Sequence, residues 1–77
     1  MDFSAEKTGQ RIKELRAEKG LTQKELANLI GGAQNTIAQY EKGLAKPSVD
    51  VVVKLVQIFN VTSDYLLGIT DYPSSPL

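Results

Sequence analysis

The amino-acid sequence predicts an all-α domain of five short helices around one compact core. Apolar residues recur three and four positions apart in several segments, which is the periodicity of helices with one buried face. A serine or threonine stands before most of these segments, where it can act as N-cap. A glycine follows most of them, where a residue with positive φ ends a helix at no steric cost. The chain has 77 residues, which is enough for one domain with a modest core.

The first helix is expected to begin between Ser4 and Gly9 and to end at Lys19, with Gly20 as the residue that follows its end. Ser4 and Thr8 can both cap this helix, because each has a hydroxyl oxygen that can accept a hydrogen bond from a free backbone N–H. The sequence leaves the choice between the two caps open.

The second helix is expected at Gln23–Ile30. Thr22 is its N-cap, and Glu25 completes a capping box by accepting a hydrogen bond from the Thr22 backbone. One apolar face is formed by residues at helical spacing, namely Leu26, Leu29 and Ile30. Gly31 follows this face and is suited to the left-handed conformation that ends a helix.

A third helix is expected at Gln34–Lys42 and is ended by Gly43. Ile37 and Tyr40 lie three residues apart on its inner face. Only a three-residue turn separates it from the second helix. Two short helices joined by such a turn form a helix-turn-helix, which places its second helix in the major groove of DNA. The sequence therefore predicts a DNA-binding surface on the third helix.

The C-terminal half is expected to add two more helices. Ser48 caps the fourth helix, whose apolar residues keep helical spacing as far as Phe59. The β-branched run Val51–Val53 would also suit a strand, but the helical pattern continues for three turns and favours a helix. Thr62 caps a fifth helix at Ser63–Leu67. We expect the domain to span residues 1–69 and residues 70–77, which hold two prolines and two serines, to form a flexible tail.

The composition argues against several kinds of site. The chain has no cysteine and no histidine, so it lacks disulfides, thiolate ligands and the commonest general base. We therefore expect no catalytic residue, no metal, no cofactor and no enzymatic activity. No apolar run approaches the roughly eighteen residues of a membrane span, and no signal peptide is visible. A cytoplasmic protein without a membrane partner is expected.

The net charge of zero and the pI near 6.2 do not suggest a protein that binds nucleic acid, but the charge is unevenly distributed along the chain. Residues 1–46 hold eight Lys and Arg against six Asp and Glu, a balance of +2. Residues 47–77 hold one Lys against three Asp, a balance of −2. The first half is therefore the better candidate for a face that meets phosphates.

The joint spacing of several motifs resembles the lambda-repressor-like helix-turn-helix family of bacterial and phage regulators, also called the Cro/CI or XRE family. The matching pieces are RIKELRAEKGLTQKELA (residues 11–27), TIAQYEKG (36–43), KPS (46–48) and FNVTSDYLLG (59–68). The resemblance implies five helices around one core, a double-stranded DNA operator as ligand and, usually, a homodimer. It also implies a bacterial or phage-encoded protein.

Four residues at the start of the third helix and one turn further on are the candidates for base contacts: Gln34, Asn35, Thr36 and Gln39. Asn and Gln amides can pair bidentately with adenine, and each such pair is worth about 1–3 kcal/mol of discrimination. The family commonly contacts bases from the positions of the three amides. The alternative is that these amides are ordinary surface residues of a solvated helix.

Candidate phosphate contacts flank the third helix, and they are Thr22, Gln23, Lys24, Lys42 and Lys46. The N-terminus of the second helix offers free N–H groups and a favourable dipole to a phosphate. The family uses the position of Gln23 for such a contact. For Thr22, capping alone explains the residue, and for Lys24 a solvated surface position is an equal alternative.

The resemblance also implies a partly buried, structural ion pair between Arg16 and Glu41. Two residues depart from the family pattern. Ala33 stands where the family usually has a Ser or Thr cap, and the loss of such a cap costs about 1 kcal/mol. Gly32 stands where the family usually has an apolar residue, which thins the core beneath the turn. Gly32 can also act as a weak cap, or the turn can be recast, so the first contacting residue stays open.

A dimer interface is expected on the fourth and fifth helices, with Val51, Ile58, Tyr65, Leu66 and Ile69 as its residues. Such a surface would suit a two-fold dimer on a pseudo-palindromic operator with half-sites about 34 Å apart. The alternative is a monomer in which the fifth helix only covers the fourth.

These observations favour a sequence-specific transcriptional regulator that acts as a repressor by occupying an operator. The alternative is a protein-interaction module, such as an antitoxin or adaptor, that binds a protein partner through the fourth and fifth helices.

Overall fold

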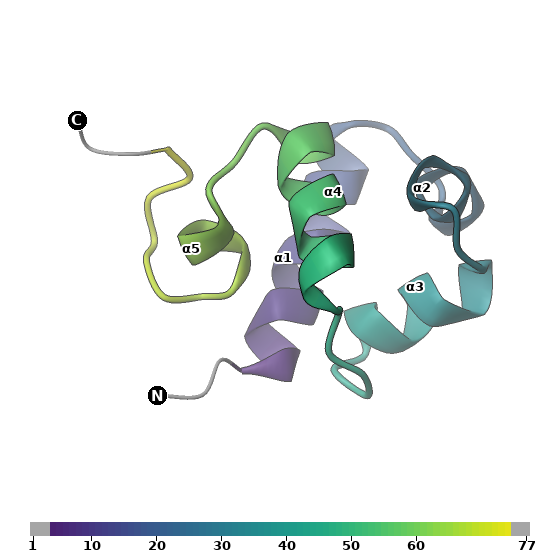
Figure 1. Cartoon of the computed structure of the whole chain (residues 1–77), viewed down its shortest axis with the longest axis horizontal. Coiled ribbons are helices and arrows are strands. Elements are labelled where there is room, and N and C mark those ends of the chain that lie inside the picture. Colours follow the sequence, from purple (N-terminus) through teal and green to yellow (C-terminus); the bar gives the residue numbers. More distant parts are fainter. Residues whose placement is uncertain (1–3, 75–77) are drawn as a thin grey trace.

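The computed structural model describes residues 4–74 as a bundle of helices, which confirms the predicted all-α class (Figure 1). The helices are α1 (Ala5–Glu18), α2 (Gln23–Ile30), α3 (Gln34–Glu41), α4 (Val49–Phe59) and α5 (Ser63–Leu66). Figure 1 shows α5 on one side of the molecule, α2 and α3 on the other side, and α1 and α4 between them. The helix-turn-helix therefore lies away from α5 and the C-terminal segment.

Local sequence signals set the ends of these helices. α2 has the predicted bounds. α1 begins after Ser4, whose hydroxyl accepts a hydrogen bond from the Lys7 N–H at 3.2 Å, so Ser4 rather than Thr8 is the cap. α1, α3 and α5 each end one residue before the predicted end, because Lys19, Lys42 and Leu67 are the C-caps.

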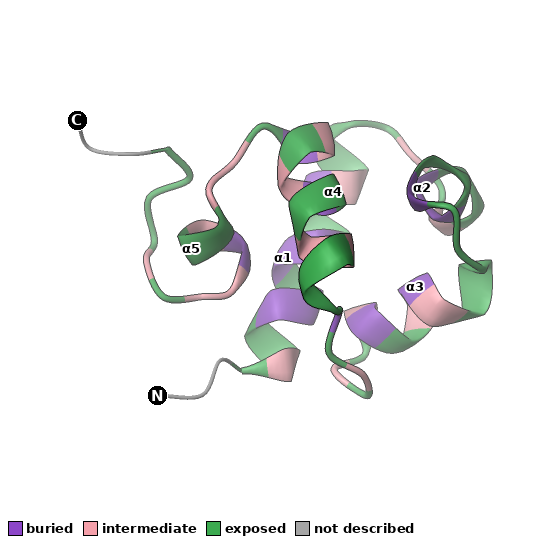
Figure 2. Cartoon of the chain, in the orientation of Figure 1, coloured by how far each residue is buried: buried purple, intermediate pink, exposed green. Residues whose placement is uncertain are grey.

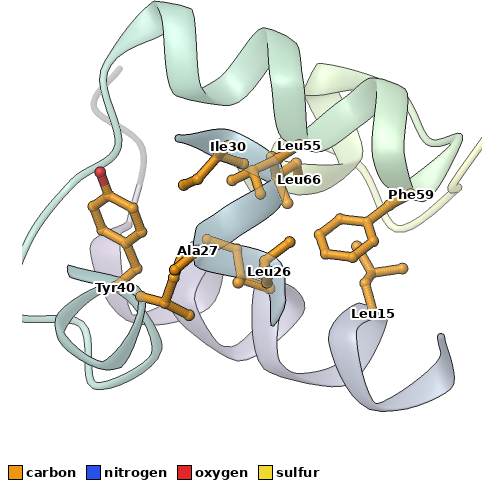
Figure 3. Packing of buried hydrophobic residues seen from close by; sticks show 10 residues of the cluster. Leu15, Leu26, Ala27, Ile30, Tyr40, Leu55, Phe59 and Leu66 are labelled. Carbon is orange, nitrogen blue, oxygen red and sulfur yellow. The ribbon is translucent and has the colours of Figure 1, made fainter. Parts of the chain in front are cut away.

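One apolar cluster forms the core, and every helix contributes to it (Figures 2 and 3). Each helix has one apolar residue with no exposed surface, and these are Ile12, Leu26, Ile37, Leu55 and Leu66. Burying a side chain of this size stabilises a fold by about 1.5–3 kcal/mol. The five helices are thus held around one centre, which fixes the position of α3 relative to the rest.

α1 and α3 meet at Gly9, inside α1. A Cβ atom at Gly9 would lie 2.0 Å from the carbonyl oxygen of Tyr40, which is far closer than a real Cβ contact. A glycine is therefore required where the α1 backbone touches the C-terminal end of α3. This contact sets how closely α3 approaches the body of the domain.

Arg11 ties α1 to α5 and to the segment that follows it. Its side chain is only 10% exposed, and its guanidinium lies 3.9 Å from the centroid of the Tyr65 ring. Nη1 donates hydrogen bonds to the carbonyl oxygens of Tyr65 and Thr70, and Nη2 donates to Asp71 Oδ1 at 2.8 Å. The hydrogen bond from Arg11, together with Lys7, lowers the pKa of Asp71.

The contacts of Arg11 cross the domain boundary that the sequence placed after residue 69. The Thr62 N–H also donates to the Pro73 carbonyl oxygen at 3.0 Å, so residues 70–73 lie against α5. Residues 75–77 of the expected flexible tail lie outside the described residues. Within residues 4–74, no helix is long and apolar enough to cross a membrane.

Candidate nucleic-acid interface

The turn between α2 and α3 begins with a left-handed glycine. Gly31 has φ of 71°, as expected from its place after the last apolar residue of α2. The Gly32 N–H donates to the Ala27 carbonyl oxygen at 2.8 Å, and the Gly31 N–H donates to that of Asn28 at 3.3 Å. This pair of bonds is a Schellman motif, which satisfies carbonyl groups that the helix end leaves free. The direction of α3 relative to α2 is therefore defined by backbone hydrogen bonds.

The N-terminus of α2 carries the predicted capping box. Thr22 Oγ1 accepts from the Glu25 N–H at 3.0 Å, and Glu25 Oε1 accepts from the Thr22 N–H at 2.9 Å. The hydrogen bond that the Thr22 backbone donates lowers the pKa of Glu25, and the bond with the Thr22 side chain adds to this. Thr22 therefore has the capping role that the sequence assigned to it, and its contact with a phosphate stays a prediction.

α3 has an apolar inner face and an amide-rich outer face. Ile37 is fully buried and Tyr40 is 7% exposed, whereas Gln34, Asn35 and Gln39 are all exposed. Among the described residues, these three amides have no hydrogen-bonding partner. Thr36, between them, is half-buried. The outer face thus presents free hydrogen-bond donors and acceptors, and contact of these residues with bases stays a prediction.

The lysines that are predicted to contact phosphates lie on three separate elements. Lys24 is in the first turn of α2, Lys42 is the C-cap of α3, and Lys46 is in the following loop. All three are exposed. Contact of these lysines with phosphates stays a prediction.

The Arg16–Glu41 ion pair is confirmed. Arg16 Nε donates to Glu41 Oε2 at 2.6 Å and Nη2 donates to Oε1 at 3.0 Å, which is a bidentate arrangement. The Glu41 side chain is 4% exposed and that of Arg16 is 16% exposed. The hydrogen bond with Glu41 raises the pKa of Arg16 further. Arg16 also donates to the Leu21 carbonyl oxygen at 2.8 Å, so the pair joins α1, α3 and the segment before α2.

Gln23 joins the same network, which the sequence did not reveal. Its Nε2 donates to Glu41 Oε1 at 3.1 Å. The two residues are 18 positions apart, and no local pattern connects them. A hydrogen bond therefore links Gln23, which is predicted to contact a phosphate, to the end of α3.

The predicted dimer interface needs one correction. Leu66 has no exposed surface and belongs to the core, so its assignment to an interface is wrong. It is the one fully buried apolar residue that α5 contributes to the core. Val51, Ile58 and Tyr65 are partly buried against the core, and Ile69 is 57% exposed.

Two exposed valines of α4 were not among the predicted interface residues. Val49 is 79% exposed and Val53 is 47% exposed. They line a shallow apolar groove between α4 and α5 together with Pro47, Val52, Ser63 and Leu67. Valines at positions i and i+4 lie on one face of a helix, which is the signal that could have identified them.

The chain is similar to known helix-turn-helix proteins. A helix-turn-helix family model, HTH_3, matches residues 12–66. The HTH-type transcriptional regulator ImmR of Bacillus subtilis is 42% identical over 60 residues, which are 78% of this chain and 47% of ImmR. The chain spans about half the length of the curated relatives that it matches.

Two solved structures have a similar fold. The restriction-modification controller protein C.AhdI from Aeromonas hydrophila has a TM-score of 0.73 and 34% identity, over 80% of this chain and 94% of that protein. SinR, a master regulator for biofilm formation, solved in complex with DNA, has a TM-score of 0.71 and 36% identity, over 78% of this chain and 97% of that one.

Proposed function

Because this chain belongs to the helix-turn-helix family of lambda-repressor-like, XRE-type regulators, we propose that it is a sequence-specific DNA-binding transcriptional repressor. It occupies an operator with α3 in the major groove and needs no chemical step of its own. The observation that carries this proposal is the exposed row of unpaired amides on α3, directly after the turn that orients this helix. The DNA complex of SinR supports the same use of the fold.

Base readout is proposed for the outer face of α3. Gln34 and Asn35 lie in the first turn, where a recognition helix meets base edges, and Gln39 lies further along the helix. Each amide offers both a donor and an acceptor, as adenine requires in the major groove. Thr36 is half-buried, so its contact would be with a phosphate or with the edge of one base.

Phosphate contacts are proposed for Gln23 and for the exposed lysines, with Thr22 holding the helix end that they flank. Each lysine that neutralises a phosphate releases counterions and makes binding dependent on salt. Lys24→Ala, Lys42→Ala and Lys46→Ala should each reduce the slope of log affinity against log salt by about one. Because the chain has no net charge, we expect a small total slope and a large share of affinity from direct contacts.

We also propose that two copies bind one pseudo-palindromic operator. The C-terminal half presents apolar side chains that a monomer leaves in water, and these are Val49, Val53, Ile69 and Tyr72. Pairing of these exposed side chains with those of a second copy would bury them in a two-fold dimer. We place the protein in the cytoplasm of a bacterium or of a phage-infected cell, where its operator would be.

The proposal is tested by selecting random duplex DNA on the purified protein and sequencing the enriched pool. Enrichment of a two-fold symmetric motif, with half-sites about one helical turn or 34 Å apart, is expected. Protein that is folded by circular dichroism and enriches no motif at low salt would contradict the proposal.

A second candidate function is supported by the apolar groove between α4 and α5. An antitoxin or adaptor would bind its protein partner there, with DNA as a minor ligand. This function would replace the first if affinity purification recovers a stoichiometric partner and the DNA selection recovers no motif. Substituting Val53→Lys, in the groove and outside the helix-turn-helix, should then abolish capture of that partner.

A further inference from the structure

The Glu41 carboxylate is a junction between three parts of the fold. It lies at the end of α3 and accepts hydrogen bonds from Arg16 on α1 and from Gln23 at the start of α2. Oε1 is shared between Arg16 Nη2 at 3.0 Å and Gln23 Nε2 at 3.1 Å. The carboxylate is almost fully buried, so these bonds are shielded from water and are stronger than exposed ones.

The bond to Glu41 restricts the Gln23 amide without using all of its donors. A primary amide has two N–H groups, and Glu41 accepts one of them. Gln23 is half-buried and is the first residue of α2, where the backbone N–H groups have no partner within the helix. Its second N–H has no partner among residues 4–74, and the residue stands at a helix N-terminus, which favours an anion.

The positive charge of Arg16 allows an anion to approach the Gln23 amide at the N-terminus of α2. An unpaired carboxylate at Glu41 would repel a phosphate that approaches Gln23. The bidentate bonds from Arg16 neutralise that charge at both carboxylate oxygens, including Oε1, which accepts from Gln23. The ion pair thus supplies an acceptor for Gln23 without presenting a net negative charge to DNA.

We propose that Glu41 is a positioning residue for DNA binding, which holds the Gln23 amide so that its free N–H meets a backbone phosphate. This inference rests on the proposed DNA-binding function. It gives Glu41 a role beyond the ion pair and links the phosphate contact of α2 to the end of the recognition helix α3. When α3 is seated correctly, Gln23 is held in its binding orientation before DNA arrives, which lowers the entropy lost on binding.

A double-mutant cycle on operator affinity tests the coupling. The reference is wild type, and the second background is Arg16→Met with Glu41→Leu, which removes both charges together so that neither stays buried alone. In wild type, Gln23→Ala should weaken binding about five-fold, as expected for one lost hydrogen bond. In the second background, Gln23→Ala should weaken operator binding by less than about two-fold, because Glu41 no longer holds the Gln23 amide. An equal cost in both backgrounds would overturn the inference.

A merely structural role for Glu41 gives a different pattern. It would lower affinity by the same factor with and without Gln23, so the effects would be additive. Gln10→Ala is the matched control, because Gln10 Nε2 donates to Glu14 Oε1 at 3.0 Å in an exposed pair on α1. We expect Gln10→Ala to leave affinity unchanged. Gln23→Ala should also leave the salt slope unchanged, because a neutral amide releases no counterion.

A second measurement does not depend on any variant folding. In the free wild-type protein, NMR relaxation of side-chain amide nitrogens should show Gln23 restricted and the exposed Gln34 mobile. Equal mobility of the two amides would overturn the inference.

The failure of this inference can be told apart from the failure of the proposed function. If an operator is bound but Gln23→Ala has no effect on affinity, the inference fails and the proposed function stands. If no duplex is bound at all, both fail.

Discussion

α2 and α3 are equally long, with eight residues each, but they are stabilised in different ways. α2 has a capping box at its start and a Schellman motif at its end. α3 has Ala33 as its N-cap residue, whose side chain makes no capping hydrogen bond. Helices this short are marginal on their own, so α3 depends on contacts with other elements. The helix that we propose reads DNA is thus the one that its own sequence holds less firmly.

The contacts that compensate for the missing cap of α3 lie on its inner face and at its C-terminal end. Ile37 and Tyr40 enter the core, the Tyr40 backbone rests on Gly9, and Glu41 is bound by Arg16 and Gln23. The N-terminal turn, with Gln34 and Asn35, has no comparable support. The difference predicts that substitutions at the end of α3 have large effects on stability, and that substitutions at its start have small effects on stability but act on binding.

The largest effect is expected from Glu41→Leu. This change leaves the Arg16 guanidinium, 16% exposed, without its charge partner, which should cost about 3–5 kcal/mol of unfolding free energy. Urea unfolding followed by circular dichroism measures it. Adding Arg16→Met should recover most of the loss. A cost under about 1 kcal/mol for Glu41→Leu would show that α3 does not depend on this pair.

The next effect is expected from Gly9→Ala. The new methyl group would overlap the Tyr40 carbonyl oxygen, so α1 and the end of α3 must move apart, at about 1–3 kcal/mol. The control is Gly32→Ala, where the methyl group would lie 3.7 Å from Ile30 and fit without displacement. Thermal unfolding should show a clear loss for the first variant and little change for the second. Equal effects of the two would contradict the close approach at Gly9.

Smaller effects are expected from the caps, and these have opposite signs. Thr22→Ala removes the cap of α2 and should cost about 1 kcal/mol. Ala33→Ser supplies a cap that α3 lacks and should stabilise the domain by about 1 kcal/mol. Chemical unfolding of both variants checks this. If Ala33→Ser does not stabilise the domain, α3 has another means of satisfying its first N–H groups.

The smallest effect is expected on the stability of the domain at acidic pH, through Glu25 in the capping box of α2. The pKa of Glu25 is lowered in the folded protein, so its contribution to stability is full above the ordinary pKa near 4.5 and is lost as the pH falls through the folded value. Glu25→Gln should therefore lose less stability than wild type between about pH 5 and pH 3. Urea midpoints across that range measure this. Parallel curves would contradict the capping interaction of the Glu25 carboxylate.

Short-range features of the fold could be predicted from the sequence because they depend on neighbouring residues. The bounds of α2 and the capping box at Thr22 follow from residues no more than a few positions apart. The missing cap at Ala33 was implied by the comparison with the family pattern, and the structure has no capping hydrogen bond there. The Arg16–Glu41 pair, 25 positions apart, was implied only by the resemblance to a family. The resemblance to the family thus predicted a long-range contact that local sequence patterns do not indicate.

Long-range contacts without a local pattern could not be predicted. Arg11 binds Thr70 and Asp71, which are 59 and 60 positions away, and nothing near Arg11 in the sequence indicates this. Leu66 was placed at an interface because helical spacing alone does not say which apolar residues of a short helix face inward. Gly9 did carry a signal, because a glycine inside a helix often marks a close packing contact.

If the free amides of α3 read bases, removing one of them must change the DNA sequence that the protein prefers. The DNA selection is run in parallel on wild type and on Gln34→Ala, with thermal unfolding to verify that both are folded. We expect the variant to bind about 1–3 kcal/mol more weakly and to lose preference at one base pair in each half-site, with the rest of the motif retained. An unchanged preference at every position would contradict the placement of α3 as the helix that reads the operator.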